Sequence, residues 1–250
     1  MAESVGINAA PADALPPLYR APQMLNAERH RTVGVTEIND FSFAKDAGAL
    51  PLGADELFLA QAHYPIVFTG NDPPVPVAVL GIGRNLFIES DGRWRRGAYI
   101  PAYIRRYPFI LAKPAPSASS FLAIDESAAC VNWNGGGRPL YDGDKPSTLA
   151  RQALEFCLAF EMQLGVARNF AEALRAAGIL VVRRADLRFN DGSRRTLDGF
   201  RVIDEGLFDA MPNDTFLSWR RNGWLGLVYA HLLSMRNWQG LPVGSLAAPT

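Results

Sequence analysis

Cysteine and histidine are scarce in this chain, which has two cysteines and three histidines among its 250 residues. Cys130 and Cys157 do not form a C-x-x-C pair, and two thiols in a chain of this length exclude a disulfide framework. Such sparse cysteine usage is typical of a reducing compartment. The first residues contain no basic segment followed by an apolar one, so we expect no secretory signal. The sequence therefore predicts a cytoplasmic protein.

The chain also lacks an excess of charge of either sign and any long apolar run. Twenty-five basic and 25 acidic residues give a formal net charge of zero, which removes the long-range field that favours binding to nucleic acid or an anionic membrane. Its longest apolar stretches, such as Ile179–Val182 and Leu225–Val228, are far shorter than the ~20 residues that span a bilayer. We expect neither nucleic-acid binding nor membrane insertion.

Recognisable catalytic fingerprints are missing as well. The sequence contains no P-loop, no H-E-x-x-H, no G-x-S-x-G and no G-x-G-x-x-G after a strand. The glycines of Gly81–Gly83 precede an expected strand, so we interpret them as a turn. Gly135–Gly137 offers backbone N–H groups for an anion nest, although a plain loop is the simpler interpretation. Cys130 has no basic neighbour in sequence, which argues against an activated thiolate.

What is present fits a globular protein, because 48% of the residues are hydrophobic and 20% are charged. Residues 1–24 are rich in alanine and proline, and we expect a flexible or extended tail there. A second tail is expected at residues 242–250. No repeat and no polar linker interrupts residues 25–241, so the sequence predicts a single domain over that range.

Short β-branched and alternating runs bounded by turn residues predict strands. The connections in the first half of the chain are too short for crossover helices, so these strands should pair in an antiparallel manner. Pro76 should stand at a strand start or on an edge strand. The predicted strands cover residues 32–38, 65–69, 75–81, 85–89, 109–112, 121–125, 179–182, 187–189 and 195–203.

Apolar residues at three- and four-residue spacing predict a long helix near residues 147–177. Ser147 is its expected N-cap, Gly165 a candidate break and Gly178 the stop signal. Shorter helices are predicted at residues 55–63 (capped by Asp55), 102–107, 207–211, 214–221 and 224–238. Strands followed by a long helix, a hairpin and further helices predict an α+β fold, mainly antiparallel sheet with a helical C-terminal part.

The stretch Ala98–Leu111 concentrates tyrosines, prolines and an arginine pair. Pro101 suits the first turn of a helix, and Pro108 should end it. Arg105 and Arg106, beside Tyr107, are candidate ligand-binding residues, because paired guanidinium groups hold carboxylate or phosphate in a bidentate manner. Ion pairing within the chain is the alternative for both arginines.

Acidic pairs end two of the predicted strands. Asp125–Glu126 and Asp204–Glu205 could bind a cation or act in acid–base chemistry. Helix capping, or pairing with Arg105 and Arg106, is the simpler interpretation. We keep Asp125 and Glu126 as candidate ligand-binding residues.

Two histidines are candidate site residues. His63 and His231, together with Asp125, could assemble a non-haem metal site of two histidines and one carboxylate only if the fold brings them together. The simpler interpretation places His63 at a helix end, bonded to a carbonyl, and His231 in the core. We expect no cofactor.

The C-terminal quarter is aromatic, with Trp219, Trp224 and Trp238 close in sequence. Core packing is the default interpretation of such a cluster. A partner-binding face or an oligomer contact is the alternative.

Taken together, several segments resemble the bacterial SapC family, which is distinct from the transporter permease of the same name. The resemblance runs from about Met24 to Leu241 and preserves the order of the family's motifs. The segments that carry it are His63–Phe68, Pro76–Gly81, Asn85–Phe87, Tyr99–Phe109, Ala123–Glu126, Leu197–Glu205 and Tyr229–Asn237.

The resemblance implies little about mechanism, and the missing catalytic fingerprints together with the aromatic C-terminal quarter favour an accessory or binding protein. The family name derives from a surface-layer locus, and relatives are encoded near TonB-dependent receptors, tryptophan-halogenase-like proteins and cupin-like proteins. A role in nutrient uptake, or in the modification of an outer-membrane or peptide substrate, is therefore implied. We also expect a partner protein or peptide, and a homo-oligomer is a further candidate. A metal-dependent enzyme that uses His63, His231 and a carboxylate is one alternative, and a structural surface-layer component is another.

Overall fold

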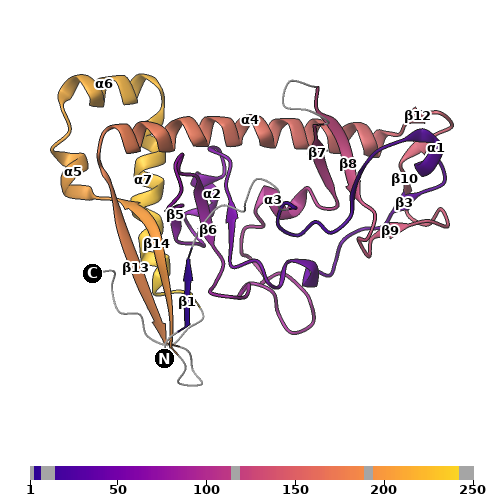
Figure 1. The fold of residues 1–250 in the computed structure, drawn as a ribbon, viewed down its shortest axis with the longest axis horizontal. Coiled ribbons are helices and arrows are strands. Elements are labelled where there is room, and N and C mark those ends of the chain that lie inside the picture. Colours follow the sequence, from indigo (N-terminus) through magenta and orange to yellow (C-terminus); the bar gives the residue numbers. More distant parts are fainter. Residues whose placement is uncertain (1–2, 7–14, 114–118, 189–193, 242–250) are drawn as a thin grey trace.

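One long helix, α4 (Thr148–Ala176), runs along the molecule, and the sheets lie along one side of it (Figure 1). The computed structural model describes residues 3–6, 15–113, 119–188 and 194–241. Its antiparallel sheets, long helix and helical C-terminal part confirm the predicted α+β class. Within the described residues, no helix has the length and apolarity needed to cross a membrane.

Helix α4 forms for the reasons that the sequence indicated. The Ser147 hydroxyl accepts a hydrogen bond from the Ala150 N–H at 3.2 Å, as an N-cap does. Gly178, with φ of +69°, follows the last turn. Gly165 does not break the helix, since one interior glycine costs only about 1 kcal/mol and the turns around it are packed. The buried face of α4 comprises Ala150, Cys157, Phe160, Leu164, Ala167, Phe170, Ala171 and Leu174.

The largest sheet has the strand order β1-β14-β5-β6-β4, with β13 paired to β14. Its strands are β1 (Glu3–Gly6), β4 (Ala49–Pro51), β5 (Ile66–Phe68), β6 (Pro76–Val79), β13 (Leu180–Arg188) and β14 (Arg194–Ile203). All pairs are antiparallel except β1 with β14. Strand β6 begins at Pro76, as expected for a residue that cannot donate a backbone hydrogen bond. The predicted hairpin around residue 190 is the pair β13–β14.

A second sheet lies near the other half of α4. It has the order β2-β8-β7, formed by β2 (Pro22–Met24), β8 (Phe121–Asp125) and β7 (Phe109–Ala112). Two small ladders lie beyond it, β10-β3-β9 and β11-β12. Their strands are β3 (Gly34–Val35), β9 (Val131–Asn132), β10 (Arg138–Pro139), β11 (Tyr141–Asp142) and β12 (Lys145–Pro146). The end of the predicted N-terminal tail therefore pairs with the body of the protein through β2.

The remaining helices are short, and three of them gather at the C-terminal end of α4 (Figure 1). Helical segments other than α4 are α1 (Ala27–His30), η1 (Ser42–Ala44), α2 (Leu57–Ala60), α3 (Ala102–Arg105), α5 (Glu205–Asp209), α6 (Asn213–Arg221), α7 (Trp224–Ser234) and η2 (Met235–Trp238). Trp219 and Trp238 are both 4% exposed, which confirms core packing for these two tryptophans.

Three local predictions are wrong. Residues 85–89 form no strand, because the Asn85 side chain accepts the Phe87 N–H at 2.9 Å and turns the chain instead. The strand predicted at residues 32–38 is much shorter in the structure, where only the two residues of β3 form it. Asp55 does not cap α2; the helix begins at Leu57 behind Glu56, with no side-chain cap.

Candidate functional site

The segment Tyr99–Phe109, which we call the central segment, is fixed at its start by a buried acid. The Glu56 carboxylate accepts the Ala102 N–H at 2.6 Å, the Tyr99 hydroxyl at 2.9 Å and the Gly53 N–H at 2.9 Å. Burial raises the pKa of Glu56 above its usual range, although these hydrogen bonds oppose the shift. Sequence reasoning missed this residue, because Asp55 and Glu56 together look like the acidic start of a short helix.

Arg105 points to the surface and is already engaged. Its Nε donates to the Ile100 carbonyl at 3.0 Å, and its Nη2 donates to the Tyr99 hydroxyl at 3.0 Å. The guanidinium also lies 5.3 Å from the centre of the Phe156 ring. The Arg105 side chain therefore covers one edge of the central segment.

Arg106 points the opposite way, into the core, and is only 4% exposed. Its guanidinium carbon lies 4.1 Å from the ring centre of Tyr103, 5.0 Å from that of Phe160 and 5.6 Å from that of Tyr19. Glu161 is its ion-pair partner, at 3.4 Å. Because the two guanidinium groups face different surroundings, the structure does not bring Arg105 and Arg106 together as one clamp.

The other predicted site residues also lie apart. His231 is fully buried between α7 and β14, where its Nε2 accepts the Ile203 N–H at 3.1 Å, and burial lowers its pKa to about 3. His63 lies just after α2, partly exposed, and burial lowers its pKa. In the described part of the chain, no three His, Cys, Asp or Glu side chains are grouped so that they could hold a metal ion.

Asp125 holds the N-terminal segment onto β8. Its carboxylate accepts the backbone N–H groups of Arg20 at 2.8 Å and Ala21 at 3.1 Å, and both the N–H and the hydroxyl of Ser127. Burial alone would raise the pKa of Asp125, but these hydrogen bonds outweigh it and hold the pKa below its usual value. These contacts give Asp125 a structural role.

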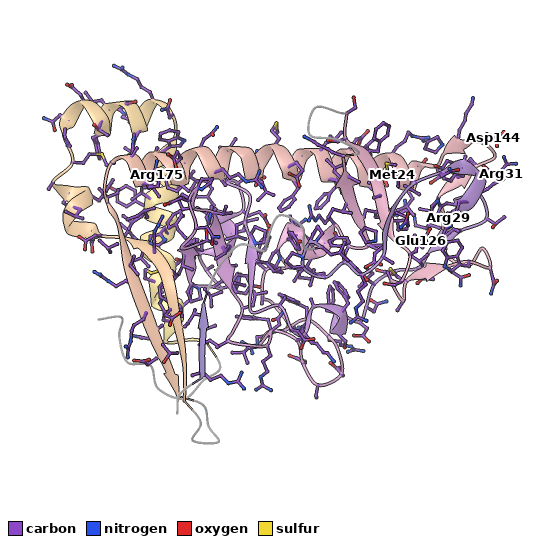
Figure 2. All side chains as sticks on the ribbon, viewed as in Figure 1. Met24, Arg29, Arg31, Glu126, Asp144 and Arg175 are labelled. Atoms are coloured by element: carbon purple, nitrogen blue, oxygen red, sulfur yellow. The ribbon has the colours of Figure 1, made fainter. Side chains whose placement is uncertain are left out.

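Glu126 forms an ion pair with Arg29 at one end of the molecule, and Arg175 lies toward the other end (Figure 2). It takes two hydrogen bonds from Arg29, at 2.5 and 2.6 Å, and contacts the buried His30 at 3.0 Å. The Arg29 guanidinium lowers the pKa of Glu126. The prediction that Asp125–Glu126 pairs with Arg105 and Arg106 is therefore wrong, whereas Asp204 does cap α5 through the Leu207 N–H.

Several cavities border the central segment. One of about 500 Å³, the Tyr107 cavity, is lined by Leu18, Arg20, Thr36–Asp40, Ser42, Phe43, Lys45, Tyr107, Ser127, Ala129 and Cys130. The Arg106 cavity, about 390 Å³, is lined by Val35, Thr36, Ile38, Arg105–Phe109, Leu149, Gln152, Ala153 and Phe156. A third, of about 200 Å³, includes Tyr99, Arg105, Leu59, Ala159 and Met162. A separate apolar cavity of about 580 Å³ lies at the far end of α4 and includes Ile179, Met211 and Trp219.

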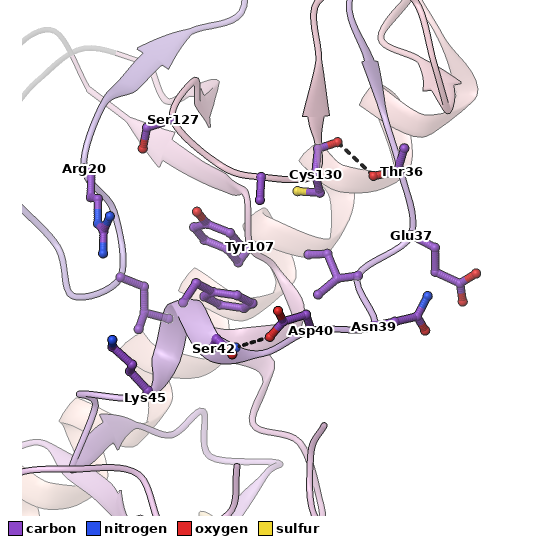
Figure 3. Close-up of a pocket in the computed structure, with 14 residues that line it drawn as sticks. Arg20, Thr36, Glu37, Asn39, Asp40, Ser42, Lys45, Tyr107, Ser127 and Cys130 are labelled. Atoms are coloured by element: carbon purple, nitrogen blue, oxygen red, sulfur yellow. Dashed lines mark hydrogen bonds between the residues drawn. The ribbon is translucent and has the colours of Figure 1, made fainter. Parts of the chain in front are cut away.

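The Tyr107 cavity has an aromatic floor and charged sides. The Tyr107 and Phe43 rings are stacked, with centres 4.1 Å apart and planes 13° apart. Arg20 and Lys45 lie on one side of these rings and Glu37, Asn39 and Asp40 on the other, so the charges are separated across the cavity (Figure 3). Its volume falls in the range of ligand pockets, roughly 300–1,000 Å³.

One wall of the Tyr107 cavity is irregular chain whose backbone groups are left unpaired by other backbone groups. The last backbone–backbone hydrogen bond before this segment is donated by the Thr36 N–H to the Cys130 carbonyl, at 2.9 Å. Residues 37–40 make no backbone–backbone hydrogen bond within the described residues and belong to no helix or strand. Unpaired backbone groups of this kind can form hydrogen bonds with the backbone of another chain.

The opposite wall contains a strained residue. Leu18 has φ of +79°, the one non-glycine residue with positive φ in the described part of the chain. This conformation costs a leucine about 1–2 kcal/mol and persists only where its surroundings fix it. Here the next residue, Tyr19, is buried, and its hydroxyl donates to the Phe109 carbonyl at 2.6 Å. The cavity wall is therefore preformed by packing.

Cys130 lines the Tyr107 cavity, but its thiol is not activated. Burial raises the pKa of both Cys130 and Cys157 to about 11. At pH 8 we expect both thiols to react with a disulfide reagent about 100-fold more slowly in the native protein than in the unfolded protein, because the thiolate is the reactive form. Stopped-flow labelling with and without denaturant measures this ratio, and equal rates would contradict a structural role for the two cysteines.

The fold and these cavities define an α+β protein whose central segment is bordered by ligand-sized cavities. The SapC family model matches residues 25–241, and the chain belongs to the SapC family. No curated protein and no solved structure matches the chain. Leu18 and Arg20, which complete the Tyr107 cavity, lie before the matched range.

Proposed function

We propose that the chain is an accessory protein that binds a segment of a partner polypeptide in the Tyr107 cavity. The observation that carries this proposal is that unpaired backbone and separated charges meet in one place. Residues 37–40 offer free backbone donors and acceptors, and the same residues supply the acidic side of the cavity. A polypeptide is the ligand that uses both features at once.

Each part of the cavity suits one part of an extended peptide. The peptide backbone pairs with residues 37–40, as in strand addition to a sheet edge. Its acidic side chains face Arg20 and Lys45, and its basic side chains face Glu37 and Asp40. An apolar or aromatic side chain packs at the stacked rings of Tyr107 and Phe43. Charge complementarity of this kind sets orientation and specificity more than affinity.

The cellular setting is part of the proposal. A role beside a surface-layer, nutrient-uptake or peptide-modification system follows from the family resemblance. Cys130 and Cys157 are both free and buried, which supports a reducing compartment such as the cytoplasm. In that setting the chain acts on a partner before or while the partner is processed, as an accessory protein rather than as a catalyst.

Selection from a random peptide library on the immobilised chain tests the peptide proposal. We expect selected peptides to share acidic and basic residues on either side of an apolar or aromatic one. The double variant Arg20→Glu with Lys45→Glu should lose the acidic preference and gain a basic one, because like charges then face each other.

The matched control reverses two exposed arginines of α6, Arg220→Glu with Arg221→Glu, and should leave the selected peptides unchanged. An identical set of peptides from the wild type and the Arg20, Lys45 variant would overturn the proposal. So would the recovery of no peptide above background.

A further inference from the structure

The long helix α4 carries a row of large apolar side chains that are exposed. Leu158, Met162 and Val166 follow one another at a spacing of four residues, so they form one ridge on the side away from the buried face of the helix. Their exposed fractions are 47%, 62% and 39%. Single exposed apolar residues are ordinary, whereas a continuous apolar patch marks a contact surface.

The apolar row continues onto helix α2. Leu59 is exposed and lines the same small cavity as Ala159 and Met162, so it lies beside the middle of α4. We call the surface formed by Leu59, Leu158, Ala159, Met162 and Val166 the α4 face. None of these five residues is charged, and charged residues are depleted at the centres of protein interfaces.

The residues of the exposed ridge are complementary to themselves when the helix is reversed. Met162 is the central residue of the 29 in α4. Leu158 and Val166 stand four residues before and after it, and Glu155 and Asn169 stand seven residues before and after it. Two antiparallel copies of α4 that meet at Met162 therefore set Leu158 against Val166 and Glu155 against Asn169, twice over.

Charges beside the ridge match in the same arrangement. Neither Glu155 nor Arg168 has an ion-pair partner in the part of the chain that the structure describes. Along the helix axis, Glu155 lies about 10 Å from Met162 in one direction and Arg168 lies about 9 Å from it in the other. They are too far apart to pair within one chain, but they come to the same height in the antiparallel pair. Opposite charges across an interface fix its register.

Gly165 leaves room for a second helix. A Cβ atom added at Gly165 would meet nothing within 4 Å among the described residues, so the space beside this glycine is open. Packed helices have axes about 8–10 Å apart, and small residues permit the closer approach. In the antiparallel pair, the Leu158 side chain of the second copy points at this space. The pairing thus gives a use to a glycine that lowers the helix propensity of α4.

From these observations, we infer that the protein forms a two-fold symmetric dimer in which the α4 faces of two copies pack antiparallel, centred on Met162. A two-fold interface uses the same patch of both subunits. Leu59 lies on the same flank in both copies and widens the contact, as an interface of about 800 Å² on each partner requires. No residue of α4 lines the Tyr107 cavity, so the inference is independent of the proposed peptide site.

Sedimentation of the full-length chain over a range of micromolar concentrations tests the dimer. We expect the mass of two chains. Met162→Lys places two ammonium groups side by side at the two-fold axis and should raise the dissociation constant about 100-fold or more. The matched control Leu217→Lys changes an exposed leucine of another helix, α6, and should sediment as the wild type does.

Disulfide crosslinking tests the direction of the two helices. Cys130 and Cys157 are buried, so a thiol introduced at the surface is the one that reacts. Under mild oxidation, Met162→Cys should crosslink with itself. Leu158→Cys and Val166→Cys should crosslink when they are mixed and not when each is alone, because a disulfide needs Cβ atoms about 4 Å apart.

Charge exchange tests the register. Glu155→Lys should weaken the dimer, and Glu155→Lys combined with Arg168→Glu should restore it, since these two positions can meet only between copies. A monomeric wild type would overturn the inference, and so would a Met162→Lys variant that is as dimeric as the wild type. Self-crosslinking of Leu158→Cys without a mixed product would show parallel helices and contradict it too. None of these outcomes bears on peptide selection by the Tyr107 cavity.

Discussion

Replacing His231 by glutamine should make the unfolding free energy of the protein fall less steeply as the pH is lowered. Burial lowers the pKa of His231 to about 3, whereas a histidine in the unfolded chain has a pKa of about 6.5. Between these values the unfolded state binds a proton that the folded state does not. The wild type therefore loses about 1.4 kcal/mol of unfolding free energy per pH unit as the pH falls through this window.

Urea unfolding at several pH values measures the effect. Between pH 6.5 and pH 4 we expect the wild type to lose about 3 kcal/mol more than His231→Gln. The glutamine oxygen can still accept the Ile203 N–H, so the variant should fold. His63→Gln is the control and should change the slope far less, because His63 is partly exposed. Parallel pH profiles for the wild type and His231→Gln would contradict the buried, neutral histidine.

Asp125→Asn should destabilise the protein by about 3 kcal/mol at pH 7, because the amide nitrogen cannot accept hydrogen bonds. In the wild type, both carboxylate oxygens accept backbone N–H groups, from Arg20 and Ala21. The variant leaves one of these donors facing another donor. Since the folded-state pKa of Asp125 is lowered, its stabilising effect is present above the unfolded value of about 3.9 and is lost as the pH falls through the folded value.

Equilibrium unfolding at pH 7 and at pH 3 and below checks both parts of this prediction. The difference in unfolding free energy between the wild type and Asp125→Asn should be smaller in acid than at pH 7. Asp144→Asn is the matched control, because Asp144 is 77% exposed and is paired with Arg31 at the surface. We expect it to change stability by less than about 1 kcal/mol. A loss of similar size in both variants would show that Asp125 does not anchor the N-terminal segment.

The elements with strong local signals could be predicted from the sequence. The Ser147 cap, the apolar face of α4 and the stop at Gly178 depend on residues that are neighbours along the chain. The hairpin β13–β14 is equally local. By contrast, the expected strand at residues 85–89 failed because one side-chain hydrogen bond, from Phe87 to Asn85, outweighed its apolar pattern.

The candidate site depends on contacts that no local pattern encodes. The composition of the central segment marked it in the sequence. It did not show the different contacts that the individual residues of this segment make. Glu56 reaches Ala102 across 46 residues, and Asp125 reaches Arg20 across 105. The adjacent residues Arg105 and Arg106 were expected to act together, but both have helical backbone at the end of α3. Successive side chains of a helix project about 100° apart, so one arginine lies at the surface and the other in the core. The lining of the Tyr107 cavity comes from three stretches, within 18–45, at Tyr107 and within 127–130, so only the tertiary structure reveals it.

Photo-crosslinking in living cells tests the proposed function most directly. A photoreactive phenylalanine replaces Asn39 at the wall of the Tyr107 cavity, and in a second strain it replaces Arg221 on α6. We predict a discrete crosslinked polypeptide from the Asn39 position alone, mapped to a segment with both acidic and basic residues, and its loss when Arg20→Glu and Lys45→Glu are added. The same products from both positions, or an Asn39 product that survives charge reversal, would contradict peptide binding in this cavity.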